Sequence, residues 1–248
     1  LGRSFIFVHQ RPLVAIVATG DELTDVDEPT SPWKIVSSNS YALAALARDC
    51  GAIPMQLGIA RDRREDLVEA FRNAMRADLI VSSGGVSVGD YDLVKDVMKQ
   101  EGNRMQFWRV AMRPGRPLAF GSMGGVPTVG LPGNPVSTMV SFELFVRPAL
   151  LKMMGHKNLF RRTVRARLEE EIHKKPGVRH FIRARIQRRK EGYVVVTTGD
   201  QGSGILKSMV RANGLIVLPE EATKVGAGET VNVQLLDDSL EREATPGY

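Results

Sequence analysis

The sequence has almost none of the residues on which disulfide-linked or zinc-binding domains depend. Cys50 is the single cysteine among 248 residues, so no disulfide can form within the chain, and a reducing compartment, the cytoplasm, is expected. The four histidines, His9, His156, His173 and His180, show neither HxxxH nor HExxH spacing. A zinc site is therefore not expected.

Long apolar segments are missing as well. A membrane-spanning helix needs about 20 consecutive apolar residues, and the longest candidate, residues 136–151, is interrupted by two serines, a glutamate and an arginine. No N-terminal stretch resembles a signal peptide. We therefore expect a soluble protein without a membrane partner. Its composition, 43% hydrophobic and 25% charged, suits one large domain or two smaller ones.

Positive charge is present in excess, with a net charge of +6. Much of it lies in residues 160–172 and 179–190, where basic and apolar residues alternate with the period of a strand. This pattern is typical of a solvated strand face, and it also fits a surface that faces an anion or a nucleic acid. No DNA- or RNA-binding motif accompanies it, so no nucleic-acid partner is expected.

The first part of the chain alternates between strands and helices. Residues 13–18, 52–60 and 78–85 are predicted strands, residues 40–51, 63–76 and 90–100 are predicted helices, and strands near 117–121 and 126–131 precede a helix that begins at Pro135. Strands that are apolar on both faces need helices above and below them. The fold expected for residues 12–155 is therefore α/β, a doubly wound, mostly parallel sheet domain.

The second part has a different character. Residues 162–240 contain alternating strands with turn signals at "RKEGY", "RANG" and "VGAGE". They predict a small all-β domain of barrel or sandwich type, and we take the barrel type as the expected fold. Residues 1–11 are interpreted as a leader that continues from a preceding region.

Acidic residues follow each of the first three predicted strands. Asp21 and Glu22 follow the first, Asp62 the second and Asp92 the third. In an open parallel sheet these connections meet at the carboxyl edge, where ligands bind. Oxygen ligands without a nearby cysteine or histidine favour a hard ion such as Mg²⁺. The alternative is that they are ordinary acids of turns and helix starts.

Rigid turns in the same part of the chain carry potential anion ligands. "RPGRP" holds Arg113 and Arg116 between prolines, and "LPGNPVS" places Asn134 at a predicted helix N-terminus. Together with Gly84 and Gly85, these residues predict a site for a large polyanion beside a metal.

Ser87 lies in Gly85-Val86-Ser87-Val88-Gly89, which matches the nucleophile elbow of hydrolases. An elbow also needs an acid and a histidine close by in the fold, whereas His9 precedes the predicted fold and the other three histidines lie at or past the boundary to the β domain. We therefore expect the loop to hold a ligand and Ser87 not to attack one.

Four motifs, "VAIVATGDEL", "SSGGVSVGDYD", "RPGRPLAFG" and "GLPGNPVS", occur in this order ahead of the small β domain. In this the chain closely resembles the MoeA family, from about residue 12 to 237, with a sheet domain like that of MogA. The resemblance implies a molybdopterin molybdenumtransferase, related to the E domain of gephyrin, that inserts molybdate into adenylylated molybdopterin, with Mg²⁺ present and AMP released.

The resemblance also implies roles for individual residues. Catalysis and Mg²⁺ binding fall to Glu22, Asp62 and Asp92. Molybdopterin and AMP binding fall to Thr19, Gly20, Asp21, Ser83, Gly84, Gly85, Ser87, Pro132, Gly133, Asn134 and Pro135. Molybdate binding falls to Arg113, Arg116, Ser137, Arg183 and Ser203. The family loop is usually Lys-Pro-Gly-Lys-Pro; two arginines replace its lysines here, which preserves charge and changes hydrogen-bond geometry.

Family members carry two further N-terminal domains that supply most of the dimer contacts, so a homodimer is expected of the full-length protein. Two alternatives remain: a gephyrin-like scaffold module that binds a peptide, and a MogA-type molybdopterin adenylyltransferase. The carboxylates at 22, 62 and 92 favour an enzyme over a scaffold. The β domain and "RPGRP" argue against the adenylyltransferase.

Overall fold

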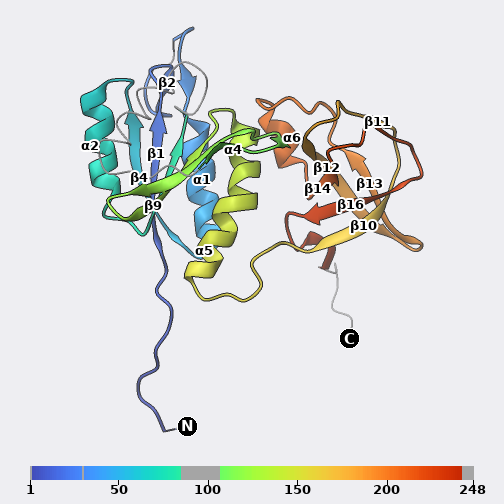
Figure 1. Cartoon of the computed structure of the whole chain (residues 1–248), viewed down its shortest axis with the longest axis horizontal. Coiled ribbons are helices and arrows are strands. Elements are labelled where there is room, and N and C mark those ends of the chain that lie inside the picture. The colour runs from blue at the N-terminus through green and yellow to red at the C-terminus, as the bar shows by residue number, and fades with distance from the viewer. Residues whose placement is uncertain (1, 30, 85–106, 242–248) are drawn as a thin grey trace. The chain divides into compact units, whose positions relative to one another are not determined.

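The computed structural model describes residues 2–29, 31–84 and 107–241 of the chain. The chain divides into two units (Figure 1). The α/β unit comprises Leu1–Val110 and Pro117–Leu159, and the β unit comprises Ala111–Arg116 and Phe160–Tyr248. The predicted helix over 90–100 and the predicted site residues Gly85, Ser87 and Asp92 lie outside the described residues.

The α/β unit is built on a mixed six-stranded sheet with the order β4-β1-β5-β9-β8-β6. Its first four strands in this order are parallel, and β8 and β6 are antiparallel to their neighbours. The strands are β1 (Leu13–Thr19), β4 (Ile53–Ala60), β5 (Leu79–Ser83), β6 (Phe107–Arg109), β8 (Pro117–Met123) and β9 (Val126–Leu131). The prediction of a mostly parallel sheet is confirmed.

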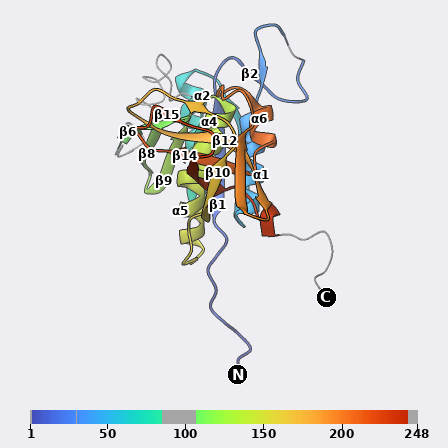
Figure 2. The ribbon, with the colours of Figure 1, turned by 90° about the vertical axis from the view of Figure 1, so that its right-hand side faces the viewer.

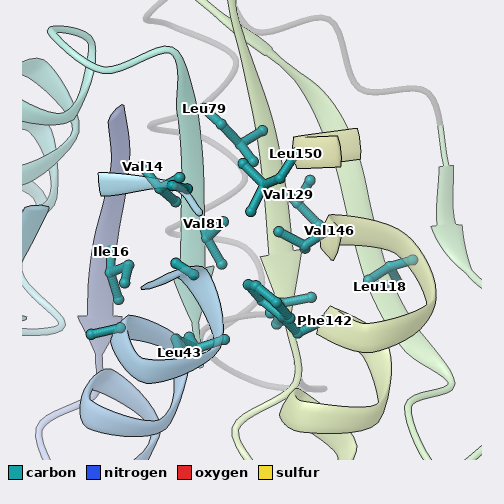
Figure 3. Close-up of a cluster of buried hydrophobic side chains, with 14 residues drawn as sticks. Val14, Ile16, Leu43, Leu79, Val81, Leu118, Val129, Phe142, Val146 and Leu150 are labelled. Carbon is teal, nitrogen blue, oxygen red and sulfur yellow. The ribbon is translucent and has the colours of Figure 1, made fainter. Parts of the chain in front are cut away.

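Helices cover both faces of this sheet. They are α1 (Ser38–Asp49), α2 (Arg64–Ala74), α4 (Pro135–Ser141), the π-helix η1 (Phe142–Val146) and α5 (Arg147–Met153). Alternate residues of β1 serve the two faces, because neighbouring side chains on a strand point in opposite directions. Val14 and Ile16 pack with α1, η1 and α5 (Figure 3), and Ala15 and Val17 pack with α2. The sheet is therefore doubly wound, as predicted.

The connection from β1 to α1 includes two short parallel strands, β2 (Leu23–Thr24) and β3 (Ile35–Val36). Figure 2 shows the segment labelled β2 extending away from the sheet of its own unit. Tyr41 in α1 donates a hydrogen bond of 2.5 Å to Asp25 Oδ1, and Thr24 Oγ1 donates one of 2.7 Å to Glu28 Oε2. These bonds hold the start of the segment, and both lower the pKa of the accepting carboxylate.

The β unit is a small barrel. Its sheet has the order β13-β10-β16-β14-β12-β7, and a further pairing of β13 with β12 closes five of these strands on themselves. The elements are β7 (Met112–Arg113), β10 (Thr163–Leu168), β11 (Ile172–His173), β12 (Arg179–Arg189), β13 (Gly192–Thr197), α6 (Leu206–Val210), β14 (Gly214–Leu218), β15 (Lys224–Val225), β16 (Thr230–Leu235) and the 3₁₀ helix η2 (Ser239–Glu241). Small aliphatic side chains fill the interior, among them Val164, Ala184, Ile216 and Val233. The predicted barrel-type domain is confirmed.

One predicted assignment is wrong. The sequence placed "RPGRP" with the α/β domain, whereas residues 111–116 belong to the β unit. β7 pairs in parallel with β12, with Met112 opposite Arg179 and Arg113 opposite His180. The Arg179 amide also donates a hydrogen bond of 3.0 Å to the Ala111 carbonyl. These main-chain bonds attach the loop to the barrel.

In the part of the chain that the structure describes, no helix is both long and apolar enough to cross a membrane.

Candidate functional site

The carboxyl ends of β1, β4, β5 and β9 lie at one edge of the sheet because these four strands are parallel. The connections after β1 and β4 are tied together there. The Asp21 amide donates to Asp62 Oδ2 and the Asp62 amide donates to Asp21 Oδ1, both at 3.1 Å. Two of the sequence-predicted acids are thus adjacent, and each fixes the backbone of the other.

A pocket of about 290 Å³ opens at this edge. It is lined by Ala18, Thr19, Glu22, Leu23, Ile35, Val36, Ser37, Ser38, Asn39, Ser83, Gly84, Gly133, Asn134 and Pro135. Seven of these were predicted from the sequence, namely Thr19, Glu22, Ser83, Gly84, Gly133, Asn134 and Pro135. The lining contains one carboxylate and neither lysine nor arginine, so the described walls offer uncharged donors and acceptors in place of cations.

Asn39, which the sequence analysis missed, connects three walls of the pocket. Its Nδ2 donates hydrogen bonds of 2.7 Å to Ser83 Oγ at the end of β5 and to the Gly133 carbonyl in the turn before α4. Both N–H groups of the amide are therefore used. The sequence signal for Asn39 is only that of a polar residue at a helix start, where serine and asparagine are both common.

Two buried oxygens in the pocket lining have no hydrogen-bond partner among the described residues. They are Thr19 Oγ1, on a residue that is 1% exposed, and Asn39 Oδ1. A buried polar atom without a partner costs about 1–3 kcal/mol, and native proteins keep few of them. Both atoms line one pocket, so a ligand with N–H or O–H groups would satisfy them.

The two glycines of the pocket have different reasons to lack a side chain. Gly84 has a φ of +95°, and an added Cβ would collide with the carbonyl oxygen of Thr19. The fold itself therefore requires this glycine. At Gly133 an added Cβ would meet only the Cα of Gly84, at 3.8 Å, an ordinary contact. The fold tolerates a larger residue at 133, whereas the pocket would become smaller.

The predicted carboxylate cluster is only partly described. The Glu22 carboxylate lies against Gly20, where an added Cβ would come within 2.7 Å of Glu22 Cδ. Within the described ranges, no group of three or more His, Cys, Asp or Glu residues has a geometry that could hold a metal ion. Asp92, the third predicted acid, lies outside those ranges.

The residues predicted to bind molybdate lie partly in the β unit. Arg113 and Arg116 are exposed. Arg113 lines a hollow of about 570 Å³ in the β unit, together with Lys174, Lys175, His173, His180 and Glu171. Ser137 is different, because it belongs to α4 in the α/β unit and is buried.

Arg183 is buried, at 1% exposure, so the interpretation of its strand as a solvated basic face is wrong at this position. Its Nε donates to Ser208 Oγ at 3.1 Å and its Nη2 to the Gly202 carbonyl at 3.0 Å. Burial lowers the pKa of the guanidinium, Asp200 opposes this shift and Arg113 adds to it. An arginine remains charged even so. In this arrangement Arg183 anchors the loop that contains Ser203.

Comparisons with known proteins agree with this architecture. Residues 15–152 match a family model described as "Probable molybdopterin binding domain", and residues 165–236 match "MoeA C-terminal region (domain IV)". The chain thus combines a sheet domain of the molybdopterin-binding class with the C-terminal β domain found in MoeA proteins. It belongs to the MoeA family.

Similar proteins are named molybdopterin molybdenumtransferase or MoeA. A "Molybdopterin molybdenumtransferase" from Nostoc sp. is 38% identical over 241 residues, covering 91% of this chain and 53% of the relative. "Molybdopterin molybdenumtransferase 2" from Mycobacterium tuberculosis is 38% identical over 239 residues, covering 94% and 58%. A molybdopterin biosynthesis MoeA structure from Pyrococcus horikoshii aligns with a TM-score of 0.77 and 29% identity, covering 92% of this chain and 55% of the other. The chain therefore spans a little over half the length of these relatives.

Proposed function

We propose that this chain acts in molybdenum cofactor synthesis as the pterin-holding part of a molybdopterin molybdenumtransferase. The full reaction inserts molybdate into the dithiolene of adenylylated molybdopterin and releases AMP. The observation that carries the proposal is the pocket in which Thr19 Oγ1 and Asn39 Oδ1 are buried without partners. A pterin carries ring N–H and amino groups that such oxygens would accept.

The shape of the pocket supports a ring as its ligand. Leu23, Ile35 and Val36 form an apolar part of the lining, and Thr19 and Asn39 belong to its polar part. A flat heterocycle can place its face on the first and its polar edge on the second. At about 290 Å³ the described pocket is near the lower limit of roughly 300 Å³ for small-molecule sites. It therefore suits one ring system of the adenylylated pterin and not both.

The beginning of α1 is available for the phosphate. Ser37, Ser38 and Asn39 line the pocket, and the Ser37 side chain makes no capping bond to the helix backbone. The first N–H groups of a helix have no intrahelical partner and favour an anion. Because the lining holds neither lysine nor arginine, the positive potential in the described walls comes from backbone N–H groups such as these.

The carboxylates supply the donor set for Mg²⁺. Mg²⁺ prefers oxygen ligands, keeps several waters and is often held by only one or two carboxylates and a substrate phosphate. Glu22 lines the pocket and Asp62 lies beside Asp21, which fits this requirement. We assign Glu22, Asp62 and Asp92 to this role. The ion would neutralise phosphate charge while Thr19 and Asn39 orient the ring.

Molybdate recognition falls to the arginines in this proposal. Arg113 and Arg116 are exposed and can each donate two parallel hydrogen bonds to an oxyanion. Arg183 is assigned a supporting role, because its guanidinium already donates to Gly202 and Ser208. It would position Ser203 without touching the anion itself. A homodimer and a cytoplasmic location belong to the same proposal.

The test uses the full-length protein and a matched pair of variants. Thr19→Val replaces an unpartnered hydroxyl in the pocket, and Ser82→Ala removes an equally buried, unpartnered hydroxyl that does not line it. We expect Thr19→Val to weaken molybdopterin binding by about tenfold, the value of one hydrogen bond of roughly 1.4 kcal/mol. Ser82→Ala should bind as the parent does. Calorimetry with molybdopterin measures this difference, and equal affinities for all three proteins would refute the pocket assignment.

The reaction is tested separately by following AMP release from adenylylated molybdopterin in the presence of molybdate and Mg²⁺. A transferase releases AMP only when molybdate is added. An adenylyltransferase would instead form adenylylated molybdopterin from ATP, and a peptide-binding scaffold would do neither.

A further inference from the structure

Two basic segments that lie far apart in the sequence converge on the surface of the β unit. Arg165 and Arg167 belong to β10, and residues 188–190 end β12 and begin its turn into β13. The parallel pairing of β10 with β13, with Ala166 opposite Tyr193, brings the hairpin end against β10. Both segments line a hollow of about 930 Å³. The alternation in the sequence did not reveal that these segments form one surface.

The charge of this hollow is strongly unbalanced. Its lining contains five cations, Arg165, Arg167, Arg188, Arg189 and Lys190, and one carboxylate, Glu191. Arg189 pairs with Glu169 just outside the lining, at 2.7 Å between Nη1 and Oε1. For the other four cations the described part of the chain provides no ion pair. Crowded like charges repel one another and attract an anionic partner.

The same hollow contains an available strand edge. β10 pairs with β16 along Thr163–Arg167, but it pairs with β13 only from Ala166 onward. The hairpin register ends at Arg189 opposite Gly192. On the β13 side, residues 163–165 therefore pair with no strand among those the structure describes. A free strand edge can accept an extended peptide through main-chain hydrogen bonds.

We propose that this hollow binds an extended acidic segment of a partner protein. The segment adds alongside residues 163–165 of β10, and its carboxylates meet Arg165, Arg167 and Arg188. The free edge favours a peptide over a nucleic acid, because a strand edge presents both N–H donors and C=O acceptors, and a phosphate has no donor for the carbonyls. The site shares no lining residue with the two hollows described above.

The probe is a fluorescein-labelled peptide of alternating Thr and Glu, about eight residues long to match a typical strand. Its binding to the full chain is followed by anisotropy at low salt. Arg165→Ser combined with Arg188→Ser should weaken binding about tenfold or more, since each loses a charge-assisted hydrogen bond. Arg185→Ser combined with Arg211→Ser is the control, because both are exposed residues of the β unit outside this lining. It makes the same change in net charge and should alter binding less than about twofold.

Two further probes separate the parts of the proposal. A peptide of equal charge with proline in place of threonine cannot pair along the strand, and it should bind at least about tenfold more weakly, as expected for the loss of two or more main-chain hydrogen bonds. Equal binding of the two peptides overturns the strand-edge arrangement. The second probe is a single-stranded oligonucleotide of equal charge. If it binds more tightly than the Thr-Glu peptide, and the Arg165/Arg188 double variant weakens its binding to the same extent, the surface is a nucleic-acid site. This result overturns the assignment to a protein partner.

Discussion

The binding surfaces of the two units differ in chemical character. The pocket of the α/β unit is lined by hydroxyls, amides, glycines and a few aliphatic side chains, without lysine or arginine. The hollow of the β unit beside β7 is lined by Arg113, Lys175 and two histidines, together with the buried Lys174 and two carboxylates, Glu170 and Glu171. The proposed substrates, a neutral ring system joined to phosphates and an oxyanion, would need both chemistries. In this proposal the two units supply them separately.

Their buried polar groups differ in the same way. In the β unit the buried cations have partners: Lys174 Nζ donates to the carbonyls of Ala222, Glu220 and Lys175 at 2.8, 3.1 and 3.3 Å, and Arg183 donates to Ser208 and Gly202. In the α/β unit, Thr19 Oγ1 and Asn39 Oδ1 lack partners within the described residues. The buried cations thus serve the fold, whereas the unpartnered oxygens are available to a ligand.

The largest expected effect on stability comes from a substitution at Gly84, in the lining of the α/β pocket. Gly84→Ala should destabilise the α/β unit by roughly 3 kcal/mol or more, from about 1–2 kcal/mol for a left-handed residue and a further 1–3 kcal/mol for overpacking. The reason is the φ of +95° and the collision with the Thr19 carbonyl. Chemical denaturation of the full chain measures the change in the free energy of unfolding.

Gly133→Ala is the matched control for this substitution. Its added Cβ has room at 3.8 Å from Gly84 Cα, so the free energy of unfolding should change by less than about 0.5 kcal/mol, as for an ordinary surface substitution. Molybdopterin affinity should nevertheless fall, because Gly133 lines the pocket. If both variants are equally stable, the distinction between a glycine required by the fold and one required by the ligand is wrong.

The sequence predicted the α/β unit well because its signals are local. The continuous apolar run of β1 and the helical stripe of α2 are each visible within a dozen residues. Asn39 was missed for the opposite reason. Its hydrogen bond to the Gly133 carbonyl spans 94 positions in the sequence, and a polar residue at a helix start has no local feature that reveals a distant partner.

The second prediction tests whether the buried cation of the β unit serves the fold. Arg183→Met should destabilise the β unit by about 2–4 kcal/mol, because it leaves Ser208 and Gly202 without their donor at about 1–3 kcal/mol for each unpaired group. Arg185→Met, on the same strand and exposed, should change stability by less than about 0.5 kcal/mol. Hydrogen exchange of the β12 amides measures both. Similar protection in the two variants would contradict the anchoring role of Arg183.

Arg183 and the "RPGRP" loop also show where sequence patterns fail in the β unit. Strict alternation predicts Arg183 on the same face as Arg185, but β12 is buried without interruption from Ile182 to Ala184. The burial of Arg183 becomes intelligible only with its partners in the loop after β13. β7 is two residues long and pairs with a strand more than sixty residues away. A segment so short carries no periodicity from which its unit could be predicted.

The smallest expected effect concerns His180, which lies opposite Arg113 in the β7–β12 pairing. Burial lowers the pKa of His180 from the usual 6.5, and the charges of Lys174 and Arg113 lower it further. The unfolded chain then binds more protons than the folded one at pH values between the lowered pKa and about 6.5, so stability rises with pH across this window. The stability that the neutral His180 contributes should be lost on acidification and be nearly constant above about pH 7.5. His180→Asn should flatten this dependence, as measured by unfolding midpoints at several pH values.

The imidazole resonance of His180 extends this test to the ligand chemistry of the β unit. Without ligand it should titrate below 6.5, and a value at or above 6.5 contradicts the cationic surroundings assigned to this hollow. Molybdate bound at Arg113 would offset one of the two positive charges that lower the pKa of His180. The pKa of His180 should therefore rise when molybdate is added. Arg113→Ser should abolish this rise, whereas His180 should still become protonated on acidification. If molybdate leaves the titration curve unchanged, Arg113 does not bind molybdate. The two units would then differ in surface charge, without a difference in ligand.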